Sequence, residues 1–236
     1  MEMIKKKDKD LRNMWIGIGV IMLYLIASSL PYDFLALFGI NYNNLNFVLK
    51  QIYLLLYEIG LTLIIVYIYR HDFIPNFKEF RKNISTYFNK YFKYWILLVG
   101  LMGLSNIIIT NFTTTMTSEN QQTIVDLLGQ APIYTIIITM FVAPILEELV
   151  FRLSFRKIFA HTNILFIFFS GLLFGSMHVL GSLENLIDLL FIIPYSIPGF
   201  IFAYLYTKEK NIFLPISIHF LHNSVMLILQ IVLAFI

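Results

Sequence analysis

The sequence contains no cysteine, which excludes thiol nucleophiles, thiolate metal ligands and disulfides from its chemistry. It also carries little charge: only 13% of its residues are Asp, Glu, Lys or Arg, about half the share in a soluble globular domain. The polar stretches between apolar runs reach about 25 residues, which leaves no room for a sizeable soluble domain. No basic patch has the character of a nucleic-acid site, so we expect no nucleic-acid partner.

What the sequence does contain is apolar, because hydrophobic residues make up 58% of the chain. Seven runs approach the roughly 17–25 residues that a helix needs to cross a bilayer. This predicts an all-α polytopic membrane bundle with about seven transmembrane helices in a single integral membrane domain. We expect residues 1–129 to hold the N-terminal helices and residues 130–236 to form the functional core. The runs lie at 14–30, 51–69, 94–110, 132–152, 163–180, 189–206 and 212–235.

The basic residues predict the orientation of the bundle. If the N-terminus is cytoplasmic, all of the 17 lysines and arginines except Lys50 fall in cytoplasmic segments. Because basic loops stay on the cytoplasmic side, this favours a cytoplasmic N-terminus and an external C-terminus. The first run could instead be a cleaved signal peptide, although it is long for the hydrophobic region of one.

Three features outside the main motifs also suggest structure. Aromatic and aliphatic residues recur at three- and four-residue steps over 77–95, which is typical of a basic amphipathic helix in the inner interface. The polar loop 111–131 can hold a short helix over 123–128. In the sixth run, Pro194, Pro198 and Gly199 predict a kink or a break.

The fourth run contains three ionisable residues, Glu147, Glu148 and Arg152. Charged groups at bilayer depth are costly and are usually paired or functional. On an ideal helix Glu148 and Arg152 are four residues apart and face the same way, so they can pair, whereas Glu147 points about 100° away and stays free. The alternative is a buried charge cluster that only holds helices together.

Two further runs carry histidines. In the fifth run His178 shares a face with Gly171, Phe174 and Gly175, and glycines four apart allow close approach of a neighbouring helix. In the seventh run His219, His222, Asn223 and Gln230 form one polar stripe, which could also be a seam between helices. At about 1.5 Å per residue, Glu147 and His219 both lie roughly 14 Å from the cytoplasmic turns, but His178 lies about 8 Å deeper unless the fifth run is tilted or starts below the interface.

Together, EExxxR at 147–152, FxxxH at 174–178 and HxxxN at 219–223 resemble the three motifs of the CPBP family, the CAAX-protease and bacteriocin-processing (Abi) intramembrane endopeptidases. The resemblance covers about residues 130–225. It implies that Glu147 activates a water as general base, that His178 helps to hold this water, and that His219 and Asn223 stabilise the oxyanion. Glu148, Arg152, Phe174 and His222 would have supporting roles.

The involvement of a metal stays open at this stage. Glu147, His178 and His219 could form a zinc site with two histidines, one carboxylate and an open position. No HExxH ligand pair is present to require one, and we favour water activated by glutamate alone.

The sequence therefore predicts an intramembrane endopeptidase of the cell membrane, acting on a membrane-associated peptide or protein from a cavity open to the cytoplasmic half of the bilayer. Abundant Ile, Lys and Asn suggest a bacterial source, which favours a bacteriocin-like, leader or signalling peptide over a prenylated protein. One alternative is a non-catalytic membrane partner in peptide sensing or bacteriocin immunity. A small transporter is another, although paired broken helices are missing.

Overall fold

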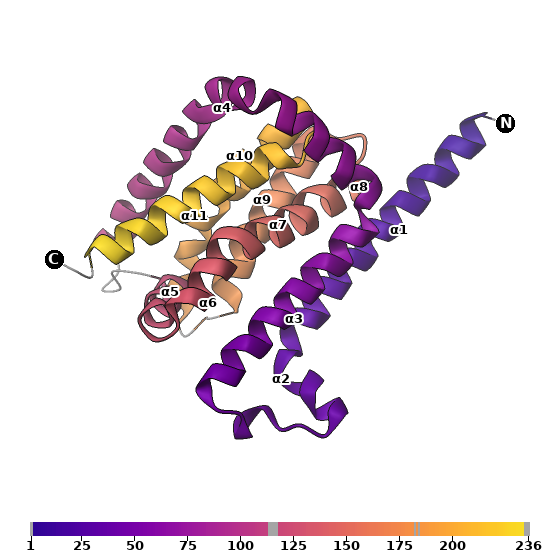
Figure 1. Ribbon diagram of the computed structural model, residues 1–236. Helices are drawn as coiled ribbons and strands as arrows, with labels where there is room; N and C mark the ends of the chain where they lie inside the picture. Colours follow the sequence, from indigo (N-terminus) through magenta and orange to yellow (C-terminus); the bar gives the residue numbers. More distant parts are fainter. Residues whose placement is uncertain (1, 113–117, 182, 184, 234–236) are drawn as a thin grey trace.

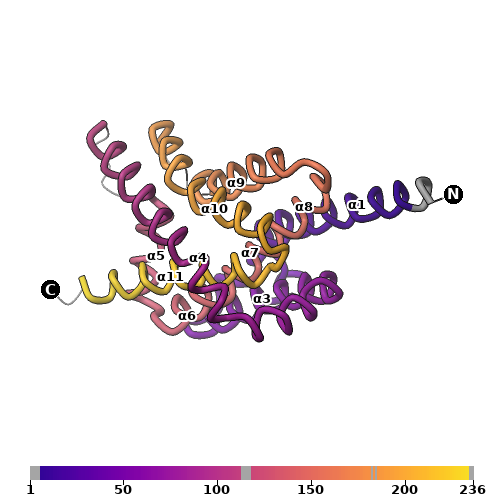
Figure 2. Tube along the Cα trace, turned by 90° about the horizontal axis from the view of Figure 1, so that it is seen from above, coloured from indigo at the N-terminus to yellow at the C-terminus, as the bar shows by residue number. Residues whose placement is uncertain are grey.

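A computed structural model describes residues 2–112, 118–181, 183 and 185–233, and every regular element among them is helical. Seven helices are long and apolar enough to cross a membrane, which confirms the predicted polytopic bundle. The N- and C-terminal helices point to opposite ends of the molecule (Figures 1 and 2). These seven candidate spans are Lys6–Ser29, Phe47–Ile68, Arg70–Phe112, Pro132–Ile158, Asn163–Leu180, Leu186–Glu209 and Phe213–Leu233.

The fourth span is built from short pieces and the other spans are mostly single helices. Two π-helical segments, Ile138–Val142 and Leu149–Ser154, interrupt it. Such segments are often found at functional sites. The helices are α1 (Glu2–Ser29), α2 (Pro31–Phe34), α3 (Phe47–Ile68), α4 (Arg70–Phe112), α5 (Glu119–Gln130), α6 (Pro132–Ile137), α7 (Ala143–Glu148), α8 (Phe155–Ile158), α9 (Asn163–Leu180), α10 (Ile192–Glu209) and α11 (Phe213–Leu233).

Helix α4 bends over one end of the bundle and then descends along its side (Figure 1). The bend coincides with Asn83, which has non-helical angles (φ −119°, ψ 15°). Residues 77–95, for which the sequence predicts an amphipathic helix, are therefore helical on both sides of a kink and continuous with the third span. Its apolar stripe does not stay on one face, because Tyr91 is buried whereas Ile84 and Phe88 are exposed. Its position in the interface stays a prediction.

The four C-terminal spans form the packed centre. Their most apolar windows are 39%, 33%, 44% and 33% buried, against 11%, 17% and 11% in the first three spans. Helices α1 and α3, which are the first two spans, nevertheless pack against this centre, since Val20 and Ile65 share one hydrophobic cluster with Leu149. The division of the chain at residues 129 and 130 stays a prediction.

Helices α9 and α10 make the closest contact in the bundle. A Cβ added to Gly175 would lie 2.3 Å from the Oγ of Ser196, and one added to Gly199 would lie 2.6 Å from the carbonyl oxygen of Gly171. The predicted close approach at the glycines of α9 is thus confirmed, with α10 as the partner. The predicted break in the sixth span does not occur: α10 continues through Pro198, and Pro194 lies in its first turn, where no intrahelical donor is needed.

Candidate active site

An ion pair sealed inside the bundle lies at the base of the site. Glu148 and Arg152 have no exposed side-chain surface, and the guanidinium holds both carboxylate oxygens, with Nε–Oε2 2.8 Å and Nη2–Oε1 3.1 Å. This confirms the predicted pair. Nη1 of Arg152 also donates to the Oγ of Ser170 at 2.8 Å, and the guanidinium lies over the ring of Phe174 at 4.9 Å. Phe174 therefore supports the pair from the adjacent helix.

His219 connects this pair to the second glutamate. Its Nδ1 lies 3.0 Å from Oε1 of Glu148. Because an ionised carboxylate can only accept, the imidazole donates from Nδ1, and this fixes which nitrogen faces the site. Nε2 then points to Glu147, 3.8 Å from its Oε2. The ring stacks on Phe202 with centroids 4.9 Å apart, so its orientation is held from both sides.

His178 approaches Glu147 from α9, and its imidazole ring has the same tautomer as that of His219. Its Nδ1 lies 2.9 Å from the carbonyl oxygen of Phe174, which can only accept, so Nδ1 carries the proton. Its Nε2 lies 3.8 Å from Oε2 of Glu147. The sequence estimate that placed His178 about 8 Å too deep is therefore wrong. Counting the rise along each helix compares depths only for parallel helices that begin at one level, and these do not.

Glu147 is the point at which the two histidines meet. Its side chain is 15% exposed whereas that of Glu148 is sealed, so a small molecule can reach only the first of the two carboxylates. Oε2 of Glu147 has no hydrogen-bond partner among the described residues. With both rings neutral, two Nε2 acceptors thus lie 3.8 Å from one buried carboxylate oxygen. Three acceptors around one point require a donor or a cation, and water is the simplest donor.

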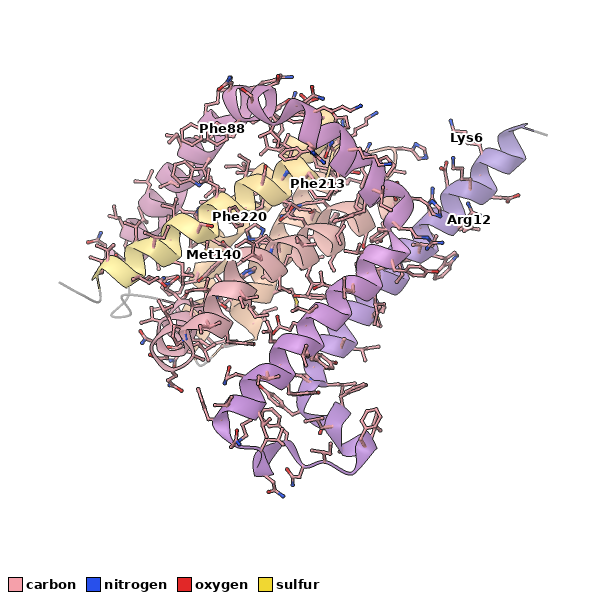
Figure 3. The ribbon with its side chains drawn as sticks, viewed as in Figure 1. Lys6, Arg12, Phe88, Met140, Phe213 and Phe220 are labelled. Carbon is pink, nitrogen blue, oxygen red and sulfur yellow. The ribbon has the colours of Figure 1, made fainter. Side chains whose placement is uncertain are left out.

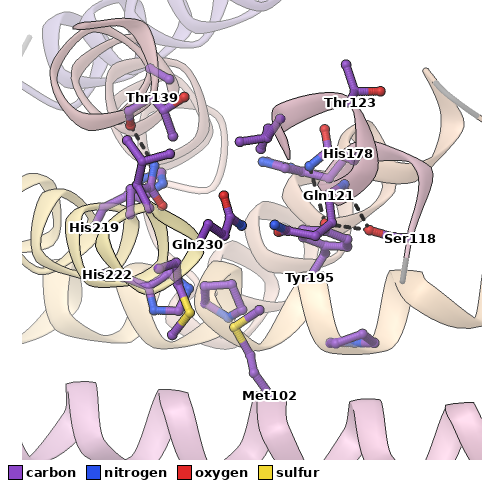
Figure 4. Close-up of a pocket in the computed structure, with 18 of the residues that line it drawn as sticks. Met102, Ser118, Gln121, Thr123, Thr139, His178, Tyr195, His219, His222 and Gln230 are labelled. Carbon is purple, nitrogen blue, oxygen red and sulfur yellow. Dashed lines mark hydrogen bonds between the residues drawn. The ribbon is translucent and has the colours of Figure 1, made fainter. Parts of the chain in front are cut away.

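Asn223 is held by an irregularity in the fourth span. The backbone N–H of Ala143 bonds to the carbonyl of Ile138, five residues back. In that pattern the carbonyl of Thr139 would accept from residue 144, but this is Pro144, which has no N–H. The side chain of Asn223 donates to the freed carbonyl at 2.9 Å (Figure 4). One amide hydrogen of Asn223 is used in this way and the other is left for the site.

His222 lines the same cavity as His219 and Asn223, as the polar stripe predicted. It is buried, and its Nδ1 has no hydrogen-bond partner within the described part of the chain. Gln230 lines the same cavity about two turns further along α11. All four residues of the stripe therefore reach one cavity.

Tyr195 was not singled out by sequence. Its ring stacks on that of His178 with centroids 5.2 Å apart and an angle of 18° between planes. Its hydroxyl lies 2.7 Å from Oγ of Ser118, which caps α5, and accepts from Asn120 at 3.2 Å (Figure 4). Helix α5 is thus tied to the histidine through one tyrosine. No local pattern marks a tyrosine for such a contact.

Glu58, in the middle of α3, is another cavity residue that the motifs do not include. Its Oε1 accepts from the hydroxyl of Tyr134 at 3.2 Å, and it forms no ion pair among the described residues. A signal for it does exist in the sequence, because it is a lone carboxylate in the apolar run 51–69.

The cavity that joins these residues has a volume of about 610 Å³. Its lining contains Glu147 and His219, and α5 borders it through Gln121 and Thr123, the border that we call the rim. Figure 4 shows His219, Gln121 and Thr123 around the cavity. With the predicted orientation, α5 lies outside the cell. A cytoplasmic N-terminus and a cavity open to the cytoplasmic half, both expected from the sequence, are therefore incompatible.

Glu147, His178 and His219 have the ligand chemistry of a zinc site with two histidines and one carboxylate, and each histidine Nδ1 is held by an acceptor, as is usual for histidines that bind a metal. The spacing is wider than such a site requires. Ligands about 2.0 Å from a tetrahedral ion lie about 3.3 Å apart, whereas both nitrogens here are 3.8 Å from the carboxylate oxygen. Among the described residues no group of three or more His, Asp or Glu side chains is placed to hold a metal ion.

An all-helical bundle with seven apolar spans and a water-accessible cluster of Glu and His defines a multi-pass membrane protein with an intramembrane polar site. Residues 129–225 match the family model described as type II CAAX prenyl endopeptidase Rce1-like. The match covers less than half of the chain, and it agrees with the resemblance to the CPBP family predicted from the three motifs.

A bacterial relative agrees with this assignment. The chain is 36% identical over 115 residues to a Bacillus subtilis (strain 168) protein named "Putative membrane peptidase YdiL". The aligned part covers 48% of this chain and 43% of the relative, so the chain spans less than half of that protein. No solved structure matches the chain.

Proposed function

We propose that this protein is an intramembrane endopeptidase that hydrolyses a peptide bond in a membrane-associated peptide or protein. The observation that carries this proposal is the convergence of His178 and His219 on the unbonded Oε2 of Glu147 inside a cavity. The match of residues 129–225 to an endopeptidase family model supports peptide hydrolysis. A polar seam that only holds helices together would pair its acceptors with donors, and this cluster leaves three acceptors facing one point.

In the proposed first step a water lies between Glu147, His178 and His219. It donates to the glutamate carboxylate and to an imidazole Nε2. As its oxygen attacks the carbonyl carbon of the scissile bond, one of its protons passes to Glu147, which is the role of a general base. The tautomers set by Phe174 and Glu148 keep both Nε2 atoms as acceptors for the water.

In the second step the oxyanion forms and collapses. The free amide hydrogen of Asn223 is available to the oxyanion, because its other hydrogen is bound to Thr139. If His219 has first taken up a second proton from solvent, its Nε2 donates to the oxyanion while its Nδ1–H still donates to Glu148, and His178 alone accepts from the attacking water. The proton taken up by Glu147 then passes to the leaving nitrogen as the C–N bond breaks, which releases a carboxylic acid and an amine.

The alternative is a metal-assisted variant, for which Glu147, His178 and His219 have suitable chemistry but lie farther apart than the ligands of a tetrahedral zinc ion. These residues would hold the ion, which would polarise the scissile carbonyl and its attacking water. Elemental analysis of the purified protein distinguishes the variants. We expect no stoichiometric zinc and full activity in chelator; stoichiometric zinc whose removal abolishes cleavage would favour the metal.

Activity is tested with purified protein in liposomes and a set of membrane-associated peptides. We expect Glu147→Gln and His219→Ala to lower kcat at least 100-fold, as loss of a general base or of an oxyanion donor does. Asp126→Asn is a matched control, since it removes an exposed carboxylate from α5. Equal cleavage by the wild type and both site variants would contradict the proposal and favour a non-catalytic membrane partner.

For the substrate we propose a bacteriocin-like, leader or signalling peptide. Comparison of the membrane peptidome of a deletion strain with that of a Glu147→Ala strain would identify it. Peptides that accumulate in both strains are the substrates, whereas accumulation in the deletion strain alone would show a role that does not depend on Glu147.

A further inference from the structure

Basic residues gather at one end of the bundle, which we name the basic end. It consists of the start of α1, the first half of α4, α8 and the turn between α10 and α11. Ion pairs connect these parts, including Lys157 with Asp72 and Lys90 with Glu209. Lys6 and Arg12 project from the end of α1 that extends beyond the bundle (Figure 3).

The cavity lies at the other end. It is bordered by α5, by the first turns of α6 and α10, and by the last turns of α9 and α11, through residues such as Tyr134, Tyr195, His178 and Gln230. In the spans that contain α6, α9, α10 and α11, these ends are the ones farther along the chain from the basic segments at 152–157 and 208–210. Ser118, which caps α5, is joined to Tyr195 in the first turn of α10, so this rim is continuous.

Dense packing separates the cavity from the basic end. Beyond Glu147, towards the cytoplasmic turn after α8, come Glu148, Leu149 and Arg152, none of which has exposed surface. On the neighbouring helices Phe166 and Leu205 are equally buried, as is Ile212 in the turn between α10 and α11. Since packed interiors exclude water, a peptide can reach Glu147 from the rim but not from the basic end.

We propose that the cavity opens on the extracytoplasmic side of the membrane and admits the extracytoplasmic part of a translocated peptide or membrane protein. The physical reason is that positively charged loops are retained in the cytoplasm, which fixes the basic end there and puts the rim outside. That the bound peptide or protein is a substrate rests on the proposed function. The direction of the opening rests on charge and packing alone.

The chemistry of the cavity lining suits a peptide that enters from the extracytoplasmic side. It contains Glu58 and Glu147 and, among the described residues, no lysine or arginine. Its rim is neutral and polar, with Asn120, Gln121 and Thr123. Such a surface offers hydrogen-bond partners to an extended peptide backbone and has no cation to attract the anionic headgroups of lipids.

The absence of cysteine allows a direct test, because any introduced thiol is the only one. Three single-cysteine variants are expressed in cells: Thr123→Cys at the rim, Met226→Cys in the cavity wall and Lys208→Cys at the basic end. Thr123 and Lys208 are both exposed, so they are matched for access to water. The probe is a small charged methanethiosulfonate that does not cross membranes, applied to intact and to permeabilised cells.

We expect Thr123→Cys and Met226→Cys to be modified fully in intact cells and Lys208→Cys only after permeabilisation. Modification of Lys208→Cys alone in intact cells, or a Met226 thiol that reacts only after permeabilisation or not at all, would overturn the proposal. The outcome does not depend on catalysis. If the thiols react as expected but no peptide is cut, the proposed function fails and the direction of the opening stands. If a peptide is cut but only Lys208→Cys is labelled in intact cells, the proposed function stands and the direction of the opening fails.

Discussion

Glu147 and Glu148 are adjacent in the chain, yet their surroundings give them different chemistry. Glu148 is enclosed and bonded to Arg152 and His219, so its oxygens are already occupied. Glu147 is partly exposed to the cavity and has an oxygen without a partner. Of the two carboxylates only Glu147 has side-chain surface in the cavity, and its unbonded Oε2, itself buried, lies beside two imidazole nitrogens, so Glu147 is the one placed to exchange a proton with a water.

We predict that Glu148→Gln destabilises the protein and that Glu147→Gln does not. Removal of one charge from a buried pair leaves Arg152 uncompensated, which costs about 3–5 kcal/mol. Thermal unfolding in detergent should show a large fall in Tm for Glu148→Gln and little change for Glu147→Gln, while cleavage is lost in the latter with normal folding. The reverse pattern would show that the roles of the two carboxylates are exchanged.

Tyr195 gives a second prediction, on its role as a positioning residue. Tyr195→Ala removes the ring stacked on His178 and should lower kcat about 10–100-fold with a smaller change in KM, as loss of a supporting contact does. Tyr195→Phe keeps the ring, loses only the bonds to Ser118 and Asn120, and should retain most of kcat. Equal losses in the two variants would show that the hydroxyl, and not the stacking, matters.

At the scale of elements, the contact between α9 and α10 holds two walls of the site at a fixed separation. His178 lies on the same face of α9 as Gly175, and Tyr195 lies next to Ser196 on α10. Because the two backbones meet with no Cβ between them, a small change in this contact moves the ring pair directly.

We predict that Gly175→Ala destabilises the bundle by about 1–3 kcal/mol, the usual cost of overpacking. Its Cβ would lie 2.6 Å from the backbone nitrogen of Ser196, which cannot move aside alone. The control is Gly100→Ala in α4, where a Cβ meets nothing within 4 Å and no such loss is expected. Unfolding in denaturant measures both, and equal midpoints would contradict the prediction.

At the scale of the whole molecule, the distribution of charge predicts the orientation. A fluorescent protein that folds only in the cytoplasm should be bright at the N-terminus and dark at the C-terminus, whereas an alkaline phosphatase that requires export should be active only at the C-terminus. Lysines cost free energy when they are moved across the bilayer, so the basic end stays inside. The opposite pair of signals would contradict a cytoplasmic N-terminus.

The sequence alone determined the membrane class, the seven spans, the pairing of Glu148 with Arg152 and the close packing at Gly175. These features depend on local quantities: the length of apolar runs, the 100° turn between neighbours on a helix and the absence of a side chain. They are fixed before helices pack, which explains why they could be predicted without the structure.

Only the tertiary structure decided the rest. It brought His178 level with Glu147, placed Tyr195 beside it, gave Asn223 the carbonyl freed by Pro144, and set the cavity at the end that carries α5. Each of these depends on where separate helices begin, how they cross and where their turns become irregular. Such relations join residues up to 84 positions apart, as Thr139 and Asn223 are, and no periodicity in the chain records them.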